Sequence, residues 1–218
     1  MRRARAAADN RRAMGPAYRI LTPRLVIRCW QPEDAGGLRE AIEASLEHLR
    51  AWLPWAQNEP ESLERKYERI RRWRGEFDLG LEFIYGVFDR AESRVLGGTG
   101  LHNRVGPDAR EIGYWVRADS TGQGLATEFS AALTRVAFEV DKVSRVEIHV
   151  VVGNERSAAV PRKLGYVYEG TLRRPHPGGG GGPLYDTMIW TMFAEKYPGS
   201  PAASHSVEAY SFSGERLL

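Results

Sequence analysis

Cysteine is almost absent from this chain of 218 residues, and the single one, Cys29, excludes an internal disulfide. That scarcity fits a reducing compartment, and we expect the cytoplasm. Apolar runs fall short of the ~20 residues of a membrane-spanning helix, so no membrane partner is expected. The chain also lacks a Gly-Lys-Ser/Thr phosphate loop, a three-glycine dinucleotide fingerprint and a serine nucleophile elbow. The sequence therefore gives no sign of a P-loop fold, of a dinucleotide-binding fold or of a hydrolase with a nucleophile elbow.

Positive charge is concentrated at one end of the chain. The net charge is +3, and residues 1–17 hold five arginines against one aspartate, which leaves the rest of the chain at −1. The basic character therefore belongs to a tail, which we expect to be disordered, and not to a folded face. We expect no specific nucleic-acid partner, and binding through the tail is the alternative.

Residues 111–127 combine a short apolar strand, a turn with two glycines and the start of a helix. Residues 111–116 have the composition of a strand, Gly122 and Gly124 follow, and apolar residues then recur every three or four positions from Leu125. A helix that starts after such a turn offers unpaired N–H groups and the positive end of its dipole to an anion. The stretch predicts a phosphate-binding loop, and a tight turn without a ligand is the alternative.

A second stretch, residues 154–166, reads as a short helix followed by a strand. Asn154 is of the residue type that caps helix N-termini, and Gly165 is of the type that ends helices. Pro161 would remove a backbone donor inside this helix, at a cost of up to ~3 kcal/mol. The sequence gives no functional reason for tolerating it.

Together the two stretches resemble the GNAT N-acetyltransferase superfamily. They are most similar to its RimJ/RimL-type branch, which acetylates N-terminal amines of ribosomal proteins and includes many small-amine relatives. The matching segments follow the family's order within residues 18–195, at positions 22–28, 49–55, 111–116, 122–128, 154–166 and 185–186. We therefore divide the chain into an Arg-rich tail (1–17), an acetyltransferase domain (18–195) and a C-terminal extension (196–218). The extension is expected to trail along the surface or to make a homodimer contact.

The resemblance implies an α/β fold with a mixed, mostly antiparallel seven-stranded sheet and helices on both faces. In this fold the strands at 111–116 and 145–151 splay apart, and acetyl-CoA enters the gap, where unpaired backbone groups can bond its amides. The N–H of Val116 or a neighbour would then face the thioester carbonyl. No metal is expected. The cofactor-binding residues so implied are Trp115, Val116, Arg117, Thr121, Gly122, Gln123, Gly124, Leu125, Ala126, Thr127, Asn154, Ser157 and Lys163, of which Lys163 could equally be a solvated helix residue.

Acetyl transfer from a thioester to an ammonium needs a base, an oxyanion donor and a proton for the leaving thiolate. Glu111 is the first candidate base, since the resemblance places it where histone-acetylating relatives carry theirs; pairing with an arginine is the alternative. His176 is the second, in the loop where the ribosomal-protein enzymes carry a glutamate. Pro161 stands where much of the superfamily has a tyrosine acid, so the resemblance assigns that role to Ser157, which could instead be a helix-cap hydroxyl.

The acceptor side is expected to include Trp52, Trp55, His102 and Tyr185. The two tryptophans could instead form an apolar plug between helices, and His102 could be structural. The sequence predicts acetyl transfer to a primary amine by direct attack, with a protein N-terminus and a small-molecule amine both open. The alternative is a catalytically weak acetyl-CoA-binding sensor or interaction module, favoured by Pro161 and by the glycine run at 178–182.

Overall fold

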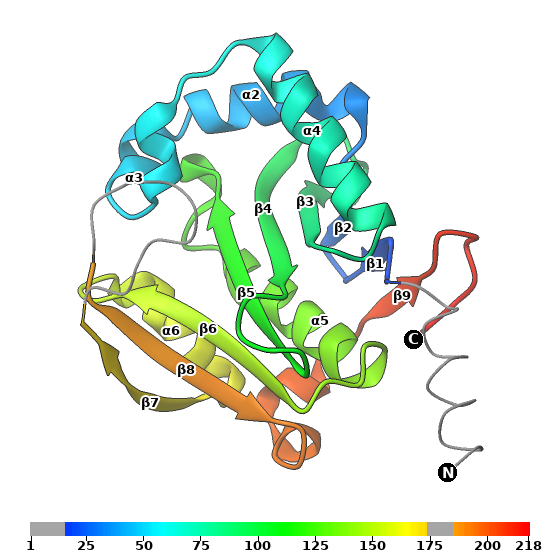
Figure 1. The fold of residues 1–218 in the computed structure, drawn as a ribbon, viewed down its shortest axis with the longest axis vertical. Coiled ribbons are helices and arrows are strands. Elements are labelled where there is room, and N and C mark those ends of the chain that lie inside the picture. Colours follow the sequence, from blue (N-terminus) through cyan, green and yellow to red (C-terminus); the bar gives the residue numbers. More distant parts are fainter. Residues whose placement is uncertain (1–15, 174–184) are drawn as a thin grey trace.

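A computed structural model describes residues 16–173 and 185–218 (Figure 1). Over these residues one mixed sheet contains nine strands in the order β7-β8-β6-β5-β4-β3-β2-β1-β9. Neighbours are antiparallel, apart from the parallel pair β5 and β6. The strands are β1 (Arg19–Leu21), β2 (Leu25–Cys29), β3 (Phe83–Asp89), β4 (Val95–His102), β5 (Ala109–Val116), β6 (Arg145–Val151), β7 (Val167–Leu172), β8 (Thr187–Phe193) and β9 (Glu208–Tyr210).

The prediction of seven strands is wrong by two. Alternation of apolar and polar residues over 19–28 predicts one first strand, but these residues form a hairpin. In its turn the N–H of Thr22 donates to the carbonyl of Leu25 at 3.0 Å, and the N–H of Leu25 donates to the Thr22 hydroxyl at 3.0 Å. Pro23 lies inside this turn and has no N–H for a continuous ladder. The other extra strand is β9, which pairs with β1.

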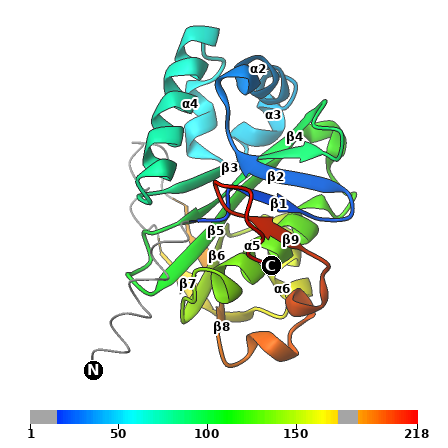
Figure 2. The ribbon, with the colours of Figure 1, turned by 90° about the vertical axis from the view of Figure 1, so that its right-hand side faces the viewer.

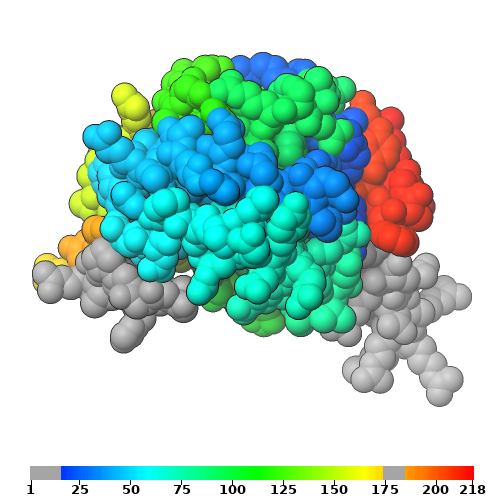
Figure 3. Space-filling view, turned by 90° about the horizontal axis from the view of Figure 1, so that it is seen from above, coloured from blue at the N-terminus to red at the C-terminus, as the bar shows by residue number. Residues whose placement is uncertain are grey.

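Helices cover both faces of the sheet, as expected (Figures 1 and 2). One layer consists of α2 (Ala35–Glu43), α3 (Leu46–Arg50) and α4 (Leu63–Asp78), and Figure 3 looks down on it. The other layer consists of α5 (Leu125–Glu139) and α6 (Glu155–Leu164), which contact each other and β6. Short 3-10 turns connect these elements: η1 (Pro32–Asp34), η2 (Pro54–Asn58), η3 (Ala118–Ser120), η4 (Tyr197–Gly199) and η5 (Pro201–Ser204). Within the described ranges, no helix combines the length and the apolar character needed to cross a membrane.

Alternation along the strands divides the apolar core between the two faces. Leu25 and Ile27 join the cluster under α5 and α6, whereas Val26 between them joins the cluster under α2 and α4. Each face then buries its own aromatic residues, such as Phe129 on α5 and Trp30 under α4. Because both faces are covered, the sheet is a rigid support for any residue at its strand ends.

The C-terminal segment packs against the sheet and does not trail over the surface. Tyr197, Ala202, Val207 and Ala209 are buried, and Ala209 lies opposite Ile20 of β1. Figure 3 shows this segment beside the N-terminal residues of the fold. Apolar residues at positions 207 and 209 alternate with polar ones, which is the pattern of an edge strand with one buried face.

The alternating charges of residues 62–74 predict a solvated helix, but one face of α4 holds a buried charge. Ser62 caps it by accepting from the Arg65 N–H, and exposed i,i+4 pairs such as Arg72 with Glu76 occur as expected. Lys66, however, is 0% exposed and its ammonium group bonds to the carboxylate of Glu59, whose side chain is 2% exposed. A charge pattern along a helix does not reveal that one lysine turns inward to a carboxylate outside the helix.

Candidate active site

Strands β5 and β6 separate at the centre of the sheet. Residues 109–111 pair in parallel with residues 145–147, and beyond Glu111 the two strands diverge (Figure 1). β6 instead continues along β8 up to the pair of Val151 with Thr187. The splay predicted from the sequence is confirmed. A cavity of about 590 Å³ lies at this separation, with walls from β5, β6, α3, α6 and the start of α5.

Backbone donors of β5 point into the gap. Arg117 N–H donates to Leu96 of β4 at 2.9 Å, and successive N–H groups of a strand point to opposite sides. The Val116 N–H therefore points away from β4, toward the cavity. Close packing of β4 and β5 fixes this register, since a Cβ on Gly97 would lie 2.3 Å from the Trp115 carbonyl oxygen.

The glycine turn ends at the N-terminus of α5, on the cavity wall. Gly124 is the N-cap residue and has a φ of +78°, and Gly122 has a φ of +76°. These are left-handed conformations that glycine adopts without the steric cost of a side chain. Gly122, Gly124 and the first helical residues line the cavity, so unpaired N–H groups and the helix dipole face it. The turn has the geometry of an anion-binding site.

A buried carboxylate in the same first turn is neutralised from the other end of the chain. Glu128 is buried and accepts from the Thr22 hydroxyl at 2.6 Å and from Arg24 Nε at 2.6 Å. Arg24 also donates to the Gln123 carbonyl at 3.0 Å. The β1–β2 turn thereby fixes the loop and offsets a negative charge that would otherwise oppose a bound anion.

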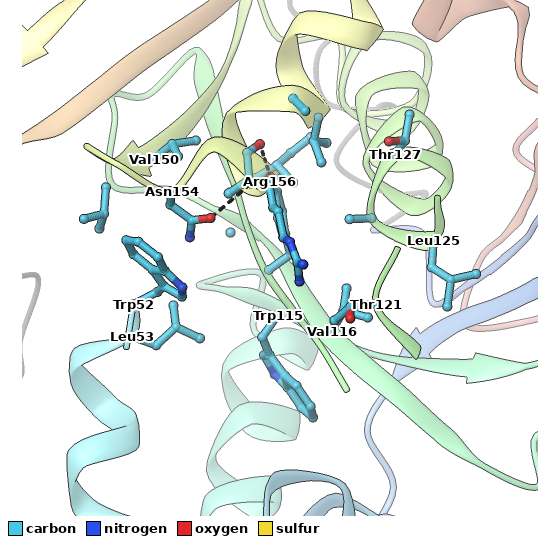
Figure 4. Close-up of a pocket in the computed structure, with 18 of the residues that line it drawn as sticks. Trp52, Leu53, Trp115, Val116, Thr121, Leu125, Thr127, Val150, Asn154 and Arg156 are labelled. Atoms are coloured by element: carbon cyan, nitrogen blue, oxygen red, sulfur yellow. Dashed lines mark hydrogen bonds between the residues drawn. The ribbon is translucent and has the colours of Figure 1, made fainter. Parts of the chain in front are cut away.

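Figure 4 shows how the remaining walls face one another across the cavity. Trp52 and Asn154 lie on one side, and Thr121 and Leu125 lie on the other. Arg156 extends from α6 into the space between them. Asn154 caps α6 by accepting from the Ser157 N–H at 3.1 Å, and Gly165 ends the helix with a φ of +87°, as predicted.

Glu111 is buried at the point where β5 leaves β6. Its side chain is 5% exposed, and Arg104 holds both carboxylate oxygens, with Nε 2.6 Å from Oε2. Burial raises the pKa of Glu111, but the hydrogen bonds and charge of Arg104 outweigh burial, so the pKa lies below its ordinary value. His149 of β6 stands beside it, with Nδ1 3.6 Å from Glu111 Oε2.

A tyrosine hydroxyl compensates for the proline inside α6. Pro161 cannot donate to the carbonyl of Ser157, four residues earlier. The Tyr114 hydroxyl donates to that carbonyl at 3.1 Å and lies 2.9 Å from the Ser157 hydroxyl. Burial raises the pKa of Tyr114 to about 12. The phenol therefore remains protonated at neutral pH and holds Ser157 at the cavity wall.

Residues 24–167 match the family model described as Acetyltransferase (GNAT) domain. The chain belongs to the GNAT acetyltransferase family. The family predicted from the sequence motifs is therefore confirmed.

Two relatives and one solved structure illustrate the GNAT match. Putative ribosomal N-acetyltransferase YdaF of Bacillus subtilis is 36% identical over 156 residues, 68% of this chain and 81% of YdaF. The ribosomal protein uS5-alanine N-acetyltransferase of Escherichia coli is 26% identical over 160 residues, 71% of this chain and 81% of that enzyme. RimL, a ribosomal L7/L12 alpha-N-protein acetyltransferase solved in complex with coenzyme A, shares the fold with a TM-score of 0.69 at 21% identity, over 79% of this chain and 95% of RimL.

Most residues predicted to bind the GNAT cofactor lie together on the cavity wall. They are Trp115, Val116, Thr121, Gly122, Gly124, Leu125, Ala126, Thr127, Asn154, Ser157 and Lys163. Arg117 lies behind the wall, buried and paired with Glu40 and Asp119. Gln123 contributes its backbone carbonyl to Arg24, and its side chain donates to the Asp119 carbonyl at 3.4 Å.

The residues predicted for the acceptor side and the second base are more scattered. Trp52 lines the cavity, while Trp55 packs edge-on against Trp115 at 6.4 Å between ring centroids. His102 bonds to Glu82. Its ring occupies the space that a side chain at Gly100 or Gly113 would need. Tyr185 accepts through its carbonyl from the Thr187 hydroxyl at 3.2 Å. His176 lies outside the described residues.

Several cavity residues were not predicted from the sequence: Arg104, Tyr114, His149 and Arg156. Tyr114 had a weak signal, because alternation within residues 111–116 places it on the face opposite Glu111. His149 is the one imidazole within an otherwise β-branched and charged strand, β6. Its distance from Glu111 depends on the parallel pairing of β5 with β6, which no local pattern encodes. In the described residues no group of three or more His, Cys, Asp or Glu side chains could hold a metal ion.

The link between Tyr114 and Pro161 can be measured as an energetic coupling. Tyr114→Phe is expected to lower the free energy of unfolding by about 1–2 kcal/mol, because the Ser157 carbonyl loses its donor. Pro161→Ala restores a backbone N–H for that carbonyl, so the same change should cost about 1 kcal/mol less in the Pro161→Ala background. Urea denaturation of the four proteins tests this. Equal costs in both backgrounds would show that the hydroxyl does not replace the missing donor.

Proposed function

We propose that the protein is an acetyl-CoA-dependent N-acetyltransferase that acetylates a primary amine by direct attack in a ternary complex. The observation that carries this proposal is the gap between β5 and β6, which opens onto the first turn of α5. The acceptor we favour is the N-terminal amine of a protein, because YdaF and the uS5 enzyme are named as ribosomal acetyltransferases. A small-molecule amine is the other class within the same chemistry, and we propose the cytoplasm as the compartment.

The cavity residues fit the parts of an acetyl-CoA molecule. The first turn of α5 would hold the diphosphate, assisted by the neutralising pair of Arg24 with Glu128. The Val116 N–H would stabilise the tetrahedral oxyanion, and the Ser157 hydroxyl would protonate or solvate the leaving thiolate. Acetyl-CoA supplies a carbonyl activated by its thiol leaving group, and the chain supplies orientation and proton transfer.

For the base, Glu111 is the predicted residue within the described structure. Its carboxylate is on the cavity wall, but Arg104 occupies both oxygens and lowers its pKa. A carboxylate so engaged accepts a proton weakly, so we give Glu111 the role of stabilising positive charge at the acceptor amine. His176 stays a prediction.

Release of free thiol from acetyl-CoA, together with calorimetric binding of CoA, tests the proposal. The acceptor panel consists of peptides with the N-termini of small ribosomal proteins, polyamines and aminated antibiotics. We expect binding and turnover with the peptides, which the matching N-acetylated mass confirms. Binding without turnover across the panel would favour the sensor alternative. Absence of CoA binding would overturn the proposal.

A further inference from the structure

His149 occupies a position in the cavity that the proposed function leaves unassigned. It lies two positions after Glu147, the last residue of β6 that pairs with β5, so its side chain leaves the sheet where β5 and β6 separate. The side chain lines the cavity and is 26% exposed. Glu111 of β5, Ser157 of α6 and Trp52, which follows α3, line the same cavity.

One ring nitrogen of His149 is held and the other is open. Nε2 lies 2.6 Å from Glu147 Oε2, a hydrogen-bond distance. A carboxylate accepts hydrogen bonds, so Nε2 carries the hydrogen and the lone pair lies on Nδ1 in the neutral ring. Nδ1 is 3.6 Å from Glu111 Oε2, too far for a hydrogen bond but close enough for charge attraction. A donor with several protons, such as an ammonium group in the cavity, can bond to both acceptors at once.

Charged residues from several elements surround the ring of His149. Glu147 comes from β6 itself and also pairs with Arg145 at 2.8 Å, while Glu111 comes from β5 and pairs with Arg104. From β8, the residue opposite His149 is Ile189, which does not titrate. Two carboxylates therefore lie close to the imidazole, and two arginines, Arg104 and Arg156 of α6, line the same cavity. The hydrogen bond from Nε2–H to Glu147 leaves Nδ1 as the ring nitrogen that can take up a proton.

We propose that His149 is the general base, taking a proton at Nδ1 from the acceptor ammonium while Glu147 holds Nε2–H. This inference rests on the proposed function and specifies its proton acceptor. The ammonium loses one proton to Nδ1 and becomes a nucleophilic amine. The nitrogen then forms the bond to the thioester carbon and loses a second proton as the carbon–sulfur bond breaks. The thiolate takes that proton, and the imidazolium releases its own to solvent.

The test compares His149→Ala and His149→Gln with the wild type on an acceptor peptide that turns over. General-base catalysis contributes about 10²–10⁴-fold, so kcat/KM at pH 7 should fall by that factor. The affinity for CoA should stay within about twofold, because no cofactor-binding group changes. In the variants, kcat/KM should rise with pH only as the free acceptor amine loses its proton. The difference in kcat/KM from the wild type should therefore become smaller above pH ~8. Added imidazole should restore part of the rate in His149→Ala.

Three further measurements separate the roles. His205→Ala, a histidine outside the cavity, should leave kcat/KM unchanged. Glu111→Gln should keep the wild-type acidic limb, because Glu111 is not the proton acceptor. Glu147→Gln should lower kcat and leave KM for acetyl-CoA unchanged. If His149→Ala had the wild-type kcat/KM, or if only Glu111→Gln lost the acidic limb of the pH profile, His149 would not be the base. The proposed function would then still stand. Absence of wild-type turnover with every acceptor would overturn the proposed function and this inference with it.

Discussion

Gly124→Glu is expected to abolish acetyl-CoA binding and to leave the fold intact. Gly124 is the N-cap of α5 and lines the cavity, so the new carboxylate would stand where the helix N-terminus faces the diphosphate. Bulk and like charge both oppose binding there. A Cβ at this position meets only Arg24 Nη2, at 3.7 Å among the described atoms, so the side chain can be accommodated. Calorimetry should detect no binding at concentrations that saturate the wild type.

A matched control separates this effect from backbone strain. Gly214 has a φ of +80°, nearly that of Gly124, and a Cβ there meets nothing within 4 Å among the described atoms. Gly214→Glu therefore imposes the same left-handed strain of about 1–2 kcal/mol, remote from the cavity. It should bind CoA like the wild type. Tight binding by Gly124→Glu, with an unchanged melting profile, would show that the glycine turn is not the diphosphate site.

Lys66→Met is expected to lower the free energy of unfolding by about 3–5 kcal/mol, the largest stability effect predicted for a single side chain here. Lys66 and Glu59 are almost fully removed from solvent, and the methionine would leave Glu59 buried without its cation. The exposed pair of Arg39 with Glu43 offers a matched control. Arg39→Met should change stability far less than Lys66→Met, because surface pairs are screened by water.

A double change identifies the cause of the loss. Replacing both residues in Glu59→Leu/Lys66→Met removes the more buried carboxylate together with its cation, and Glu61, the second partner of Lys66, keeps its pair with Arg69. Buried ion pairs so replaced are often close to neutral in stability. Most of the stability lost in Lys66→Met should therefore return in guanidinium denaturation. A single-variant loss below 1 kcal/mol would show that Glu59 reaches water or another cation when Lys66 is removed.

The parts of the site that the sequence predicted are those with local signals. The turn with Gly122 and Gly124 and the capped helix from Asn154 to Gly165 each combine residue types that act within a few positions. Their placement on one cavity followed from the family resemblance, which the splay of β5 and β6 confirms. The hairpin at Pro23 does not follow from the alternation of apolar and polar residues, because that pattern continues on both sides of the proline.

Features that depend on distant pairing were beyond the sequence. His149 comes close to Glu111 through a parallel ladder of three residue pairs, and Tyr114 meets Ser157 across 43 positions. Neither contact produces a periodic pattern in the sequence. The inward turn of Lys66 is of the same kind, because an alternating charge pattern is typical of a solvated helix face. In each case the role of the side chain depends on the residue that it contacts in the fold, and the residue type alone does not predict that contact.

The position of β9 has a consequence for the order in which the fold is completed during synthesis. β1 is among the first parts of the domain to leave the ribosome, and its partner on the outer edge, β9, is made almost 190 residues later. Until then the edge of β1 has its backbone groups open to other chains. The sheet is complete only after β9 emerges, so its last pairing joins a strand made early to one made late.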